Sequence, residues 1–369
     1  MINFYFGLLI FAALTSITII EHTYGWKNIS ITLLPESFYL ASYYILANNI
    51  MFSTGIIIAQ KIKISTINFV SINYLKVILL PSFIIGSVLH IKAFDGLDYQ
   101  DYVEFNGSDW GRVLMNFGSP IILVYLYQKK YKIVTFLLAP YMYMTIILGV
   151  RSYLLFSLAP IMIYIFLSEK NMKLSKILIY GFYALLTGLI GELILSYRSG
   201  NGGELGLVLP EQSLIEMFIV LFNQFQNESI ANESNTILLM LNYILLPFTK
   251  IFGNFTSGFD NPIFIANIMD GNDNFGGKFQ HYPSTWYGET LVSYGYYGVI
   301  MASYFGFIIG FFSKLFSNEI LKIVLLPSSI WITYMILRGA PVIAFANTAY
   351  PLWMYIITLI IPIILLRSK

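Results

Sequence analysis

The chain has 369 residues, of which 57% are hydrophobic and only 11% are charged. Soluble domains carry about 25% charged residues, so this composition excludes a soluble enzyme. The absence of cysteine excludes disulfides, thiolate zinc sites and cysteine nucleophiles, and a formal net charge of +2 argues against nucleic-acid binding. The composition indicates an all-α polytopic membrane protein, with residues 1–369 forming a single integral membrane domain.

Apolar stretches of about 20 residues, the length that a helix needs to cross a bilayer, recur along the whole chain. The first lacks a basic leading region and a small-residue cleavage site, so we expect a retained span rather than a signal peptide. The sequence predicts ten spans, at about 2–20, 37–59, 72–91, 110–127, 133–150, 152–167, 177–197, 286–312, 323–345 and 350–366.

Lysine clusters set the orientation of these spans. An even number of predicted spans separates each cluster from the next, so the positive-inside rule places all of them, and both termini, in the cytoplasm. The clusters are Lys61 and Lys63; Lys129, Lys130 and Lys132; Lys170, Lys173 and Lys176; Lys314 and Lys322; and Arg367 with Lys369.

Residues 198–285 then form one large extracytoplasmic loop, in which eight acidic residues face three basic ones. Pro210 opens a stretch of helical periodicity, and residues 236–252 are apolar but interrupted. Both are short for a bilayer, so we expect interfacial or re-entrant helices; an extra pair of spans here would raise the total to twelve without changing the orientation. The apolar residues that give the first stretch its helical spacing are Leu214, Met217, Phe218, Leu221 and Phe225.

The arginines are distributed differently from the lysines. Four of the five, Arg112, Arg151, Arg198 and Arg338, map to predicted extracytoplasmic ends of spans, where the positive-inside rule disfavours them. Arg338 lies only about 22 Å of helix past Ile323, short of a hydrocarbon core of about 30 Å, so its charge needs a partner. Arginine suits bidentate contacts with phosphate, and a lipid-linked pyrophosphate would supply that partner; the alternatives are acidic residues of the chain or lipid headgroups.

His281 and Glu289 flank the start of the span that follows the large loop. Pro283 suits the first turn of a helix that Ser284 or Thr285 would cap, which places Glu289 near the outer end of this span. Both side chains are candidate general bases for a sugar hydroxyl. The alternatives are a loop histidine and a glutamate that caps the helix.

Small residues follow Glu289 at every fourth position. They are Gly298, Ala302, Gly306 and Gly310. This spacing lets two helices approach closely, and we interpret it as a packing surface.

Aromatic and acidic residues near the outer face are less informative. Tyr282, Trp286 and Tyr287 are candidates for stacking on sugar rings, while many other aromatic residues fit the core or the interfacial belt. The acidic residues between 95 and 109 fit a solvated loop, and residues 270–274 lack the spacing of a calcium loop. We therefore expect no metal and no other cofactor.

Three groups of residues resemble the O-antigen polymerase family, the Wzy-type oligosaccharide repeat-unit polymerases. The resemblance covers roughly residues 130–345, and ten spans is slightly fewer than this family usually shows. Ser284, Glu289, Gly295 and Gly298 resemble the family's Ser…Glu…Gly-x-x-Gly run after the long outer loop, Gly149-Val150-Arg151-Ser152 is similar to its Gly-x-Arg-Ser turn, and Arg198 opens the large loop.

The resemblance implies a glycosyltransferase of the bacterial inner (cytoplasmic) membrane. Such an enzyme transfers a growing chain from its undecaprenyl-pyrophosphate carrier to the non-reducing end of a new lipid-linked repeat unit, on the periplasmic face. The expected partners are the lipid-linked oligosaccharide donor and acceptor and membrane lipid. The protein partner that this function would allow is a chain-length regulator. Arg151, Arg198 and Arg338, with Arg112, would bind pyrophosphate, and His281 or Glu289 would take the acceptor's proton.

Three other functions stay open at this point. An O-antigen ligase uses the same donor and fits the arginines and the loop histidine equally well, although the tyrosine-rich run around Glu289 favours the polymerase. A flippase would need polar groups along a central path and short loops at both faces, whereas here the ionisable groups crowd one face. An integral membrane acyltransferase would need a catalytic histidine, and the chain has just three histidines.

Overall fold

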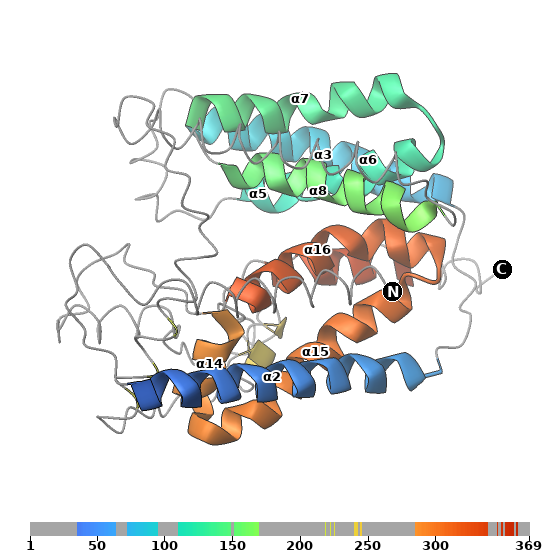
Figure 1. Cartoon of the computed structure of the whole chain (residues 1–369). Coiled ribbons are helices and arrows are strands. Elements are labelled where there is room, and N and C mark those ends of the chain that lie inside the picture. Colours follow the sequence, from blue (N-terminus) through green and yellow to red (C-terminus); the bar gives the residue numbers. More distant parts are fainter. Residues whose placement is uncertain are drawn as a thin grey trace. The chain divides into compact units, whose positions relative to one another are not determined.

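A computed structural model describes the helical segments of this chain, and the described residues contain no strand (Figure 1). The predicted spans at 2–20 and 177–197, and most of the large loop, lie outside these residues. The described residues are 35–63, 72–94, 110–148, 151–169, 218, 222, 225, 240–242, 244–245, 285–338, 345, 348–349, 351–357 and 359–360.

Within these ranges several helices coincide with predicted spans, and two predicted spans, 110–127 and 286–312, are each divided. Three are long and apolar enough to cross a membrane, at Ile72–Phe94, Trp286–Leu315 and Glu319–Leu337. This agrees with a helical membrane protein, while the total of ten spans stays a prediction. The elements are α2 (Pro35–Lys61), α3 (Ile72–Phe94), α5 (Trp110–Met115), α6 (Gly118–Tyr127), α7 (Tyr131–Leu148), α8 (Arg151–Ser168), α14 (Thr285–Tyr294), η1 (Gly295–Tyr297), α15 (Gly298–Leu315) and α16 (Glu319–Arg338).

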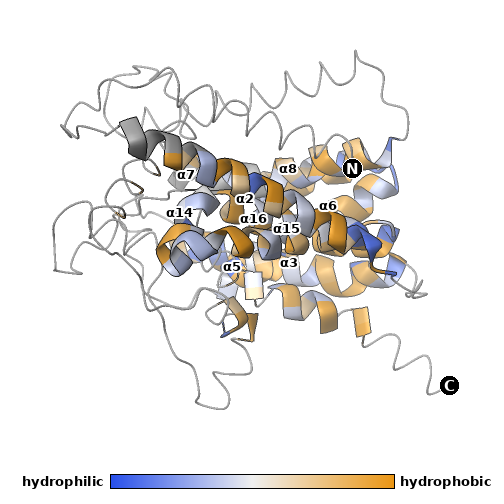
Figure 2. Cartoon of the chain, turned by 60° about the horizontal axis from the view of Figure 1, so that its bottom comes forward, coloured by the Kyte–Doolittle hydropathy of each residue, from blue (hydrophilic) through white to orange (hydrophobic). Residues whose placement is uncertain are grey.

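Apolar residues lie on more than one side of these helices, as Figure 2 shows. In α3, Leu79 and Phe83 are buried, whereas Val77 is 70% exposed and Val88 is 61% exposed. A helix that is hydrophobic all round is typical of a membrane span. Prolines occur inside α3, α7, α8 and α16, which membrane helices tolerate better than soluble ones.

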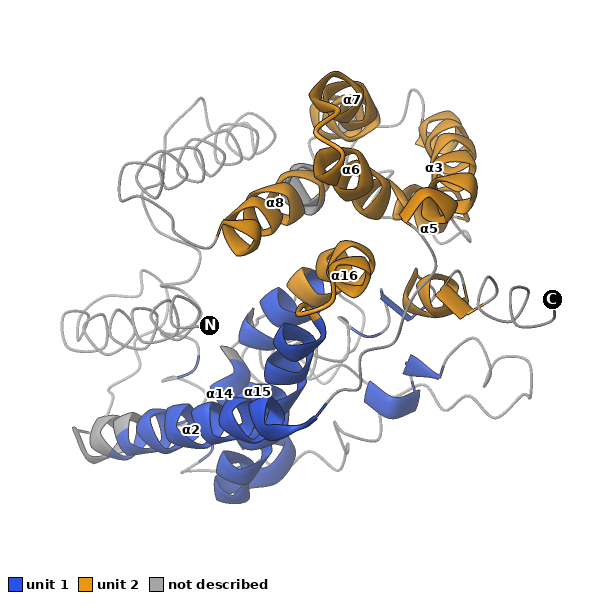
Figure 3. Cartoon of the chain, turned by 90° about the vertical axis from the view of Figure 1, so that its right-hand side faces the viewer, with its two compact units in different colours: residues 1–64, 208–315, 331–349 blue, residues 65–207, 316–330, 350–369 orange. Residues whose placement is uncertain are grey.

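The chain forms two compact units whose segments alternate along the sequence (Figure 3). Helix α16 belongs to both, since its residues up to 330 fall in the second unit and the rest in the first. The first unit comprises residues 1–64, 208–315 and 331–349, and the second comprises residues 65–207, 316–330 and 350–369.

The first unit is built on a close parallel pair, α2 and α15, which lie side by side in Figure 1. A Cβ on Gly306 would overlap the carbonyl oxygen of Phe52, and a Cβ on Gly310 would lie 2.9 Å from Ala59 Cβ. The predicted packing role of these small residues is therefore confirmed. The predicted topology has both spans running inward from the extracytoplasmic side, as a parallel pair requires.

In the second unit, α3 runs antiparallel to α5 and α6. Gln128 donates a hydrogen bond to Asn73 (3.2 Å) at one end, and Gly111 packs on the backbone of His90 at the other. The predicted span at 110–127 is thus two helices, interrupted at residues 116 and 117.

Proline explains this interruption. Pro120 has no N–H to donate to the carbonyl of Asn116, four residues earlier. The hydroxyl of Tyr355 donates to that carbonyl instead, at 2.7 Å. The hydroxyl of Tyr141 likewise donates a hydrogen bond to the carbonyl of Met115, at 2.8 Å. Side chains from distant parts of the sequence therefore satisfy the backbone groups that the break exposes.

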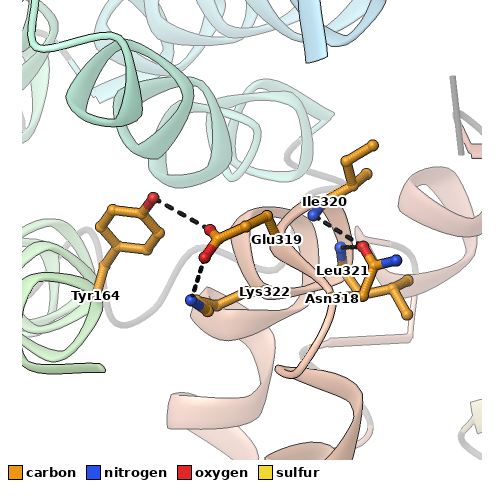
Figure 4. A network of polar contacts seen from close by, with 6 residues as sticks. All are labelled: Tyr164, Asn318, Glu319, Ile320, Leu321 and Lys322. Carbon is orange, nitrogen blue, oxygen red and sulfur yellow. Dashed lines mark hydrogen bonds and ion pairs between the residues drawn. The ribbon is translucent and has the colours of Figure 1, made fainter. Parts of the chain in front are cut away.

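A polar network fixes the start of α16 near the end of α8 (Figure 4). Asn318 caps α16, because its Oδ1 accepts hydrogen bonds from the backbone N–H groups of Ile320 (3.0 Å) and Leu321 (3.3 Å). Glu319 pairs with Lys322 at 2.6 Å and accepts a hydrogen bond from Tyr164 at 3.3 Å. This end of α8 therefore meets one of the predicted cytoplasmic lysines.

Candidate functional site

In the second unit, His90 joins the two helix ends that carry Arg112 and Arg151. His90 Nε2 lies 2.5 Å from the hydroxyl of Tyr153, and Arg151, the first residue of α8, precedes Tyr153 by two positions. On the other side, Gly111 packs against the backbone of His90, and Arg112 follows it in α5 with its side chain exposed. The structure therefore brings together the chain positions of two predicted phosphate-binding arginines.

Glycines make this approach of α5 to α3 possible. A Cβ on Gly111 would lie 2.5 Å from the backbone nitrogen of His90 and 2.9 Å from its Cα. A Cβ on Gly86, one turn earlier in α3, would overlap the backbone of α5 at Leu114. The His90 ring is further held by an edge contact with Phe94, with ring centroids 4.9 Å apart. The imidazole thus has a fixed place in the core of this unit.

Basic residues lie at both ends of the second unit. The N-terminus of a helix carries a partial positive charge from aligned peptide dipoles, and Arg151 stands at the N-terminus of α8. At the opposite end, Lys76 lies 5.3 Å over the ring of Tyr125, and Lys322 lies 5.6 Å over the ring of Tyr164. Arg151 and Tyr164 are separated by about 20 Å of helix. Within the described part of this unit, the two arginines and these lysines occupy opposite ends, as the predicted topology requires.

Glu289 lies in the first unit, in α14. This helix begins at Thr285, as predicted, and the side chain of Glu289 is only 1% exposed. Burying a carboxylate to this extent costs free energy unless hydrogen bonds or ion pairs compensate for it. Ionisable residues buried in membrane helices are therefore often functional. Glu289 therefore stays a candidate, in a closed environment rather than on an open surface.

The expected role of Trp286 and Tyr287 in sugar stacking is wrong, because both side chains are fully buried. Trp286 packs on Phe52, with ring centroids 5.4 Å apart, and Tyr287 packs on Phe218, at 5.6 Å. The rings anchor α14 to its neighbours. Sequence position near an outer loop did not reveal this, because aromatic residues fit a core and a ligand surface equally well.

A buried polar cluster accompanies Glu289 and links α14 to α2. The hydroxyl oxygen of Thr290 lies 3.0 Å from that of Tyr44 and 3.1 Å from Asn48 Oδ1, and all three side chains are buried. Tyr287 also donates to Asn49 Oδ1, at 2.9 Å. Sequence analysis missed these α2 residues because no local motif marks them and their partners lie far away in the chain.

Replacing Thr290 with valine is expected to lower the free energy of unfolding by about 1–3 kcal/mol, since the isosteric change leaves buried groups on Tyr44 and Asn48 without this partner. Thermal unfolding of the purified protein in detergent measures the effect. The matched control is Thr54→Val in α2, because the Thr54 hydroxyl donates to the backbone of its own helix on an exposed side. Equal effects of the two changes would show that the cluster contributes nothing specific.

The span predicted at 286–312 is bent at Gly295, between α14 and α15. Gly295 has φ of +57°, a left-handed conformation that favours glycine, and its carbonyl accepts a hydrogen bond from Tyr44 at 3.3 Å. The bend leaves Tyr296 55% exposed and Tyr297 82% exposed. The exposed aromatic residues of this region are thus in η1, next to the family-like Gly-x-x-Gly run.

Three phenylalanines of the large loop pack onto this bend. Phe218, Phe222 and Phe225 are helical residues, as predicted for the stretch that begins at Pro210. Phe218 stacks on Tyr44 with centroids 6.0 Å apart, and Phe225 meets the ring of Tyr296 edge-on at 5.5 Å. This part of the loop is therefore attached to the helix that contains Glu289.

Three predicted site residues are not placed in either cluster by the described part of the chain. Arg198 and His281 lie outside the described residues, and Arg338 is the last residue of α16. Among the described residues, no group of three or more histidine or acidic side chains could hold a metal ion. Comparisons of the chain with protein-family models, with curated proteins and with solved structures give no match.

Proposed function

We propose that this protein is a polysaccharide polymerase, a membrane glycosyltransferase that joins undecaprenyl-pyrophosphate-linked oligosaccharide repeat units on the periplasmic face of the inner membrane. The observation that supports it best is the convergence of Arg112 and Arg151 on one end of the second unit, beside His90. Both arginines lie away from Lys76 and Lys322, and exposed Lys92 in the last turn of α3 adds a positive charge at their end. This arrangement favours an anionic ligand at the outer face rather than a role in setting topology.

The proposed reaction is a glycosyl transfer without a nucleotide sugar. The bond between the anomeric carbon of the donor chain and its pyrophosphate breaks, and a new bond forms from that carbon to a hydroxyl of the acceptor repeat unit. The hydroxyl's proton passes to a base, His281 or Glu289, and the lipid pyrophosphate leaves with the bonding electrons. Glu289 is 1% exposed, so it could take this proton only if the acceptor's binding uncovers its carboxyl. Arg112 and Arg151, with Arg198 and Arg338, would stabilise the charge that develops on the leaving group.

Binding both lipid carriers in the same membrane also contributes to catalysis. Each substrate is confined to the membrane plane by its undecaprenyl chain, so the protein has only to orient two sugars and one pyrophosphate. The helix that carries Glu289 packs against phenylalanines of the large loop, which supports a role for this loop in enclosing the acceptor.

The polymerase is tested by deleting the gene and separating the surface polysaccharide on a gel. We expect lipid A-core that bears a single repeat unit and no ladder, with the ladder restored by the wild-type gene. Bare core with lipid-linked polymer on the periplasmic side would identify a ligase instead. Bare core with single repeats held on the cytoplasmic leaflet would identify a flippase, and an unchanged ladder would overturn the assignment altogether.

A further inference from the structure

We propose that His90 is a positioning residue for the pyrophosphate of the lipid-linked donor. Through its contact with Tyr153 it ties the first turn of α8, where Arg151 lies, to the part of α3 whose backbone packs on Gly111, next to Arg112 in α5. This inference rests on the proposed function and assigns to a buried histidine a role that no motif of the sequence indicated.

Burial excludes direct contact between His90 and a substrate. The His90 side chain is fully buried, and that of Tyr153 is only 5% exposed. Two polar groups placed in a membrane helix bundle cost free energy unless they bond to one another, and a hydrophobic pair would pack there without that cost. The presence of a histidine and a tyrosine in contact at this buried position is therefore consistent with a role beyond packing.

The position of the His90–Tyr153 contact in the fold indicates what this role is. The first turn of a helix lacks the backbone hydrogen bonds that hold its interior, so its geometry depends on tertiary contacts. Tyr153 lies in the first turn of α8, two residues from Arg151, and its hydroxyl is tied to α3. The backbone of His90 also packs against Gly111, so the same residue of α3 lies next to the helix ends of both arginines, and its ring makes the contact on the α8 side.

Four variants separate positioning from simple packing. His90→Phe keeps a ring against Phe94 but removes the polar contact, and Tyr153→Phe removes the hydroxyl alone. His90→Gln retains a polar nitrogen or oxygen at similar reach and is the conservative rescue. The double variant His90→Phe/Tyr153→Phe tests whether both changes break the same interaction.

The experiment uses the full chain in lipid nanodiscs, with polymer formation measured against donor concentration and with binding of undecaprenyl pyrophosphate measured separately. We expect His90→Phe and Tyr153→Phe each to raise KM for the donor, and Kd for undecaprenyl pyrophosphate, by about tenfold to a hundredfold, with kcat changed much less. The double variant should match the single ones, and His90→Gln should recover most of the affinity.

A second buried hydroxyl of the same unit provides the control. Tyr141→Phe removes the hydrogen bond to the carbonyl of Met115, and it should lower stability without changing KM. An equal KM shift in this control, additive effects in the double variant, or unchanged KM and Kd in folded His90→Phe and Tyr153→Phe would each overturn the inference. If His90→Phe fails to fold, Tyr153→Phe alone decides the matter.

The binding measurement also separates this inference from the proposed function. Wild-type protein that neither polymerises repeat units nor binds undecaprenyl pyrophosphate would overturn the function itself, whereas wild-type binding that His90→Phe leaves intact overturns only the role of His90. The last measurement uses nanodiscs that contain phosphatidylglycerol but no pyrophosphate lipid, and it tests whether an ordinary anionic headgroup occupies the site. Equal occupancy of the site by that headgroup would show an anionic-lipid site and overturn the specific assignment to pyrophosphate.

Discussion

Replacing Arg151 with alanine is expected to abolish polymer formation, with kcat/KM lowered by about a hundredfold to a thousandfold, while the protein still folds and inserts. Arg151 is the first residue of α8, so its replacement removes a positive charge from the end of the unit where Arg112 also lies. The loss should affect the developing charge on the leaving pyrophosphate most strongly. The measurement is the polysaccharide ladder of a deletion strain that carries the variant, with membrane protein quantified in parallel.

Two further variants complete this test. Arg151→Lys keeps the charge but loses the planar fork that binds phosphate through two hydrogen bonds, so we expect a shortened ladder rather than none. Lys130→Ala removes an exposed positive charge from the opposite end of the same unit, and its ladder should be normal. Polymer of normal length from Arg151→Ala would remove this arginine from the proposed mechanism.

Replacing Gly306 with leucine is expected to destabilise the protein by about 3 kcal/mol or more. A Cβ at this position would overlap the backbone carbonyl of Phe52, and backbone cannot move aside as a flexible side chain can. The substitution therefore forces α2 and α15 apart along their parallel contact. We expect a large loss of monodisperse protein in detergent, and a lower midpoint of thermal unfolding for what remains.

The control for added volume is Ile300→Phe in the same helix, because Ile300 is 63% exposed. This change should leave the unfolding midpoint nearly unaltered, and Gly306→Ala should fall between the two. A stable Gly306→Leu protein would contradict the observed approach of the two helices.

The length of the apolar stretches was enough to predict several helices from the sequence. The spans expected at 37–59, 72–91, 133–150 and 152–167 correspond to α2, α3, α7 and α8 within a few residues at each end. Each of these helices is apolar over most of its length, so its extent follows from local composition. The start of α14 at Thr285 was also predictable, because proline and small polar residues before an apolar run mark a helix beginning.

The interruptions and the buried polar contacts required the tertiary structure. Pro120 accounts for the break after α5, but the hydroxyls of Tyr355 and Tyr141 that satisfy the exposed carbonyls come from residues far away in the chain. Trp286 and Tyr287 are buried because Phe52 and Phe218 pack on them. The residues around α14 in the sequence do not indicate that these two phenylalanines will be its neighbours.

The candidate site divides in the same way. The sequence by itself indicated a helical membrane protein in which four of the five arginines lie away from the lysine clusters, because both follow from composition and charge position. Only the tertiary structure decided that His90 lies between the helix ends of Arg112 and Arg151, and that Thr290 meets Tyr44 and Asn48. The physical reason is the distance along the sequence over which each effect acts. Hydrophobicity and helix-start signals can be read within one segment, whereas a hydrogen bond between helices depends on how separate segments pack.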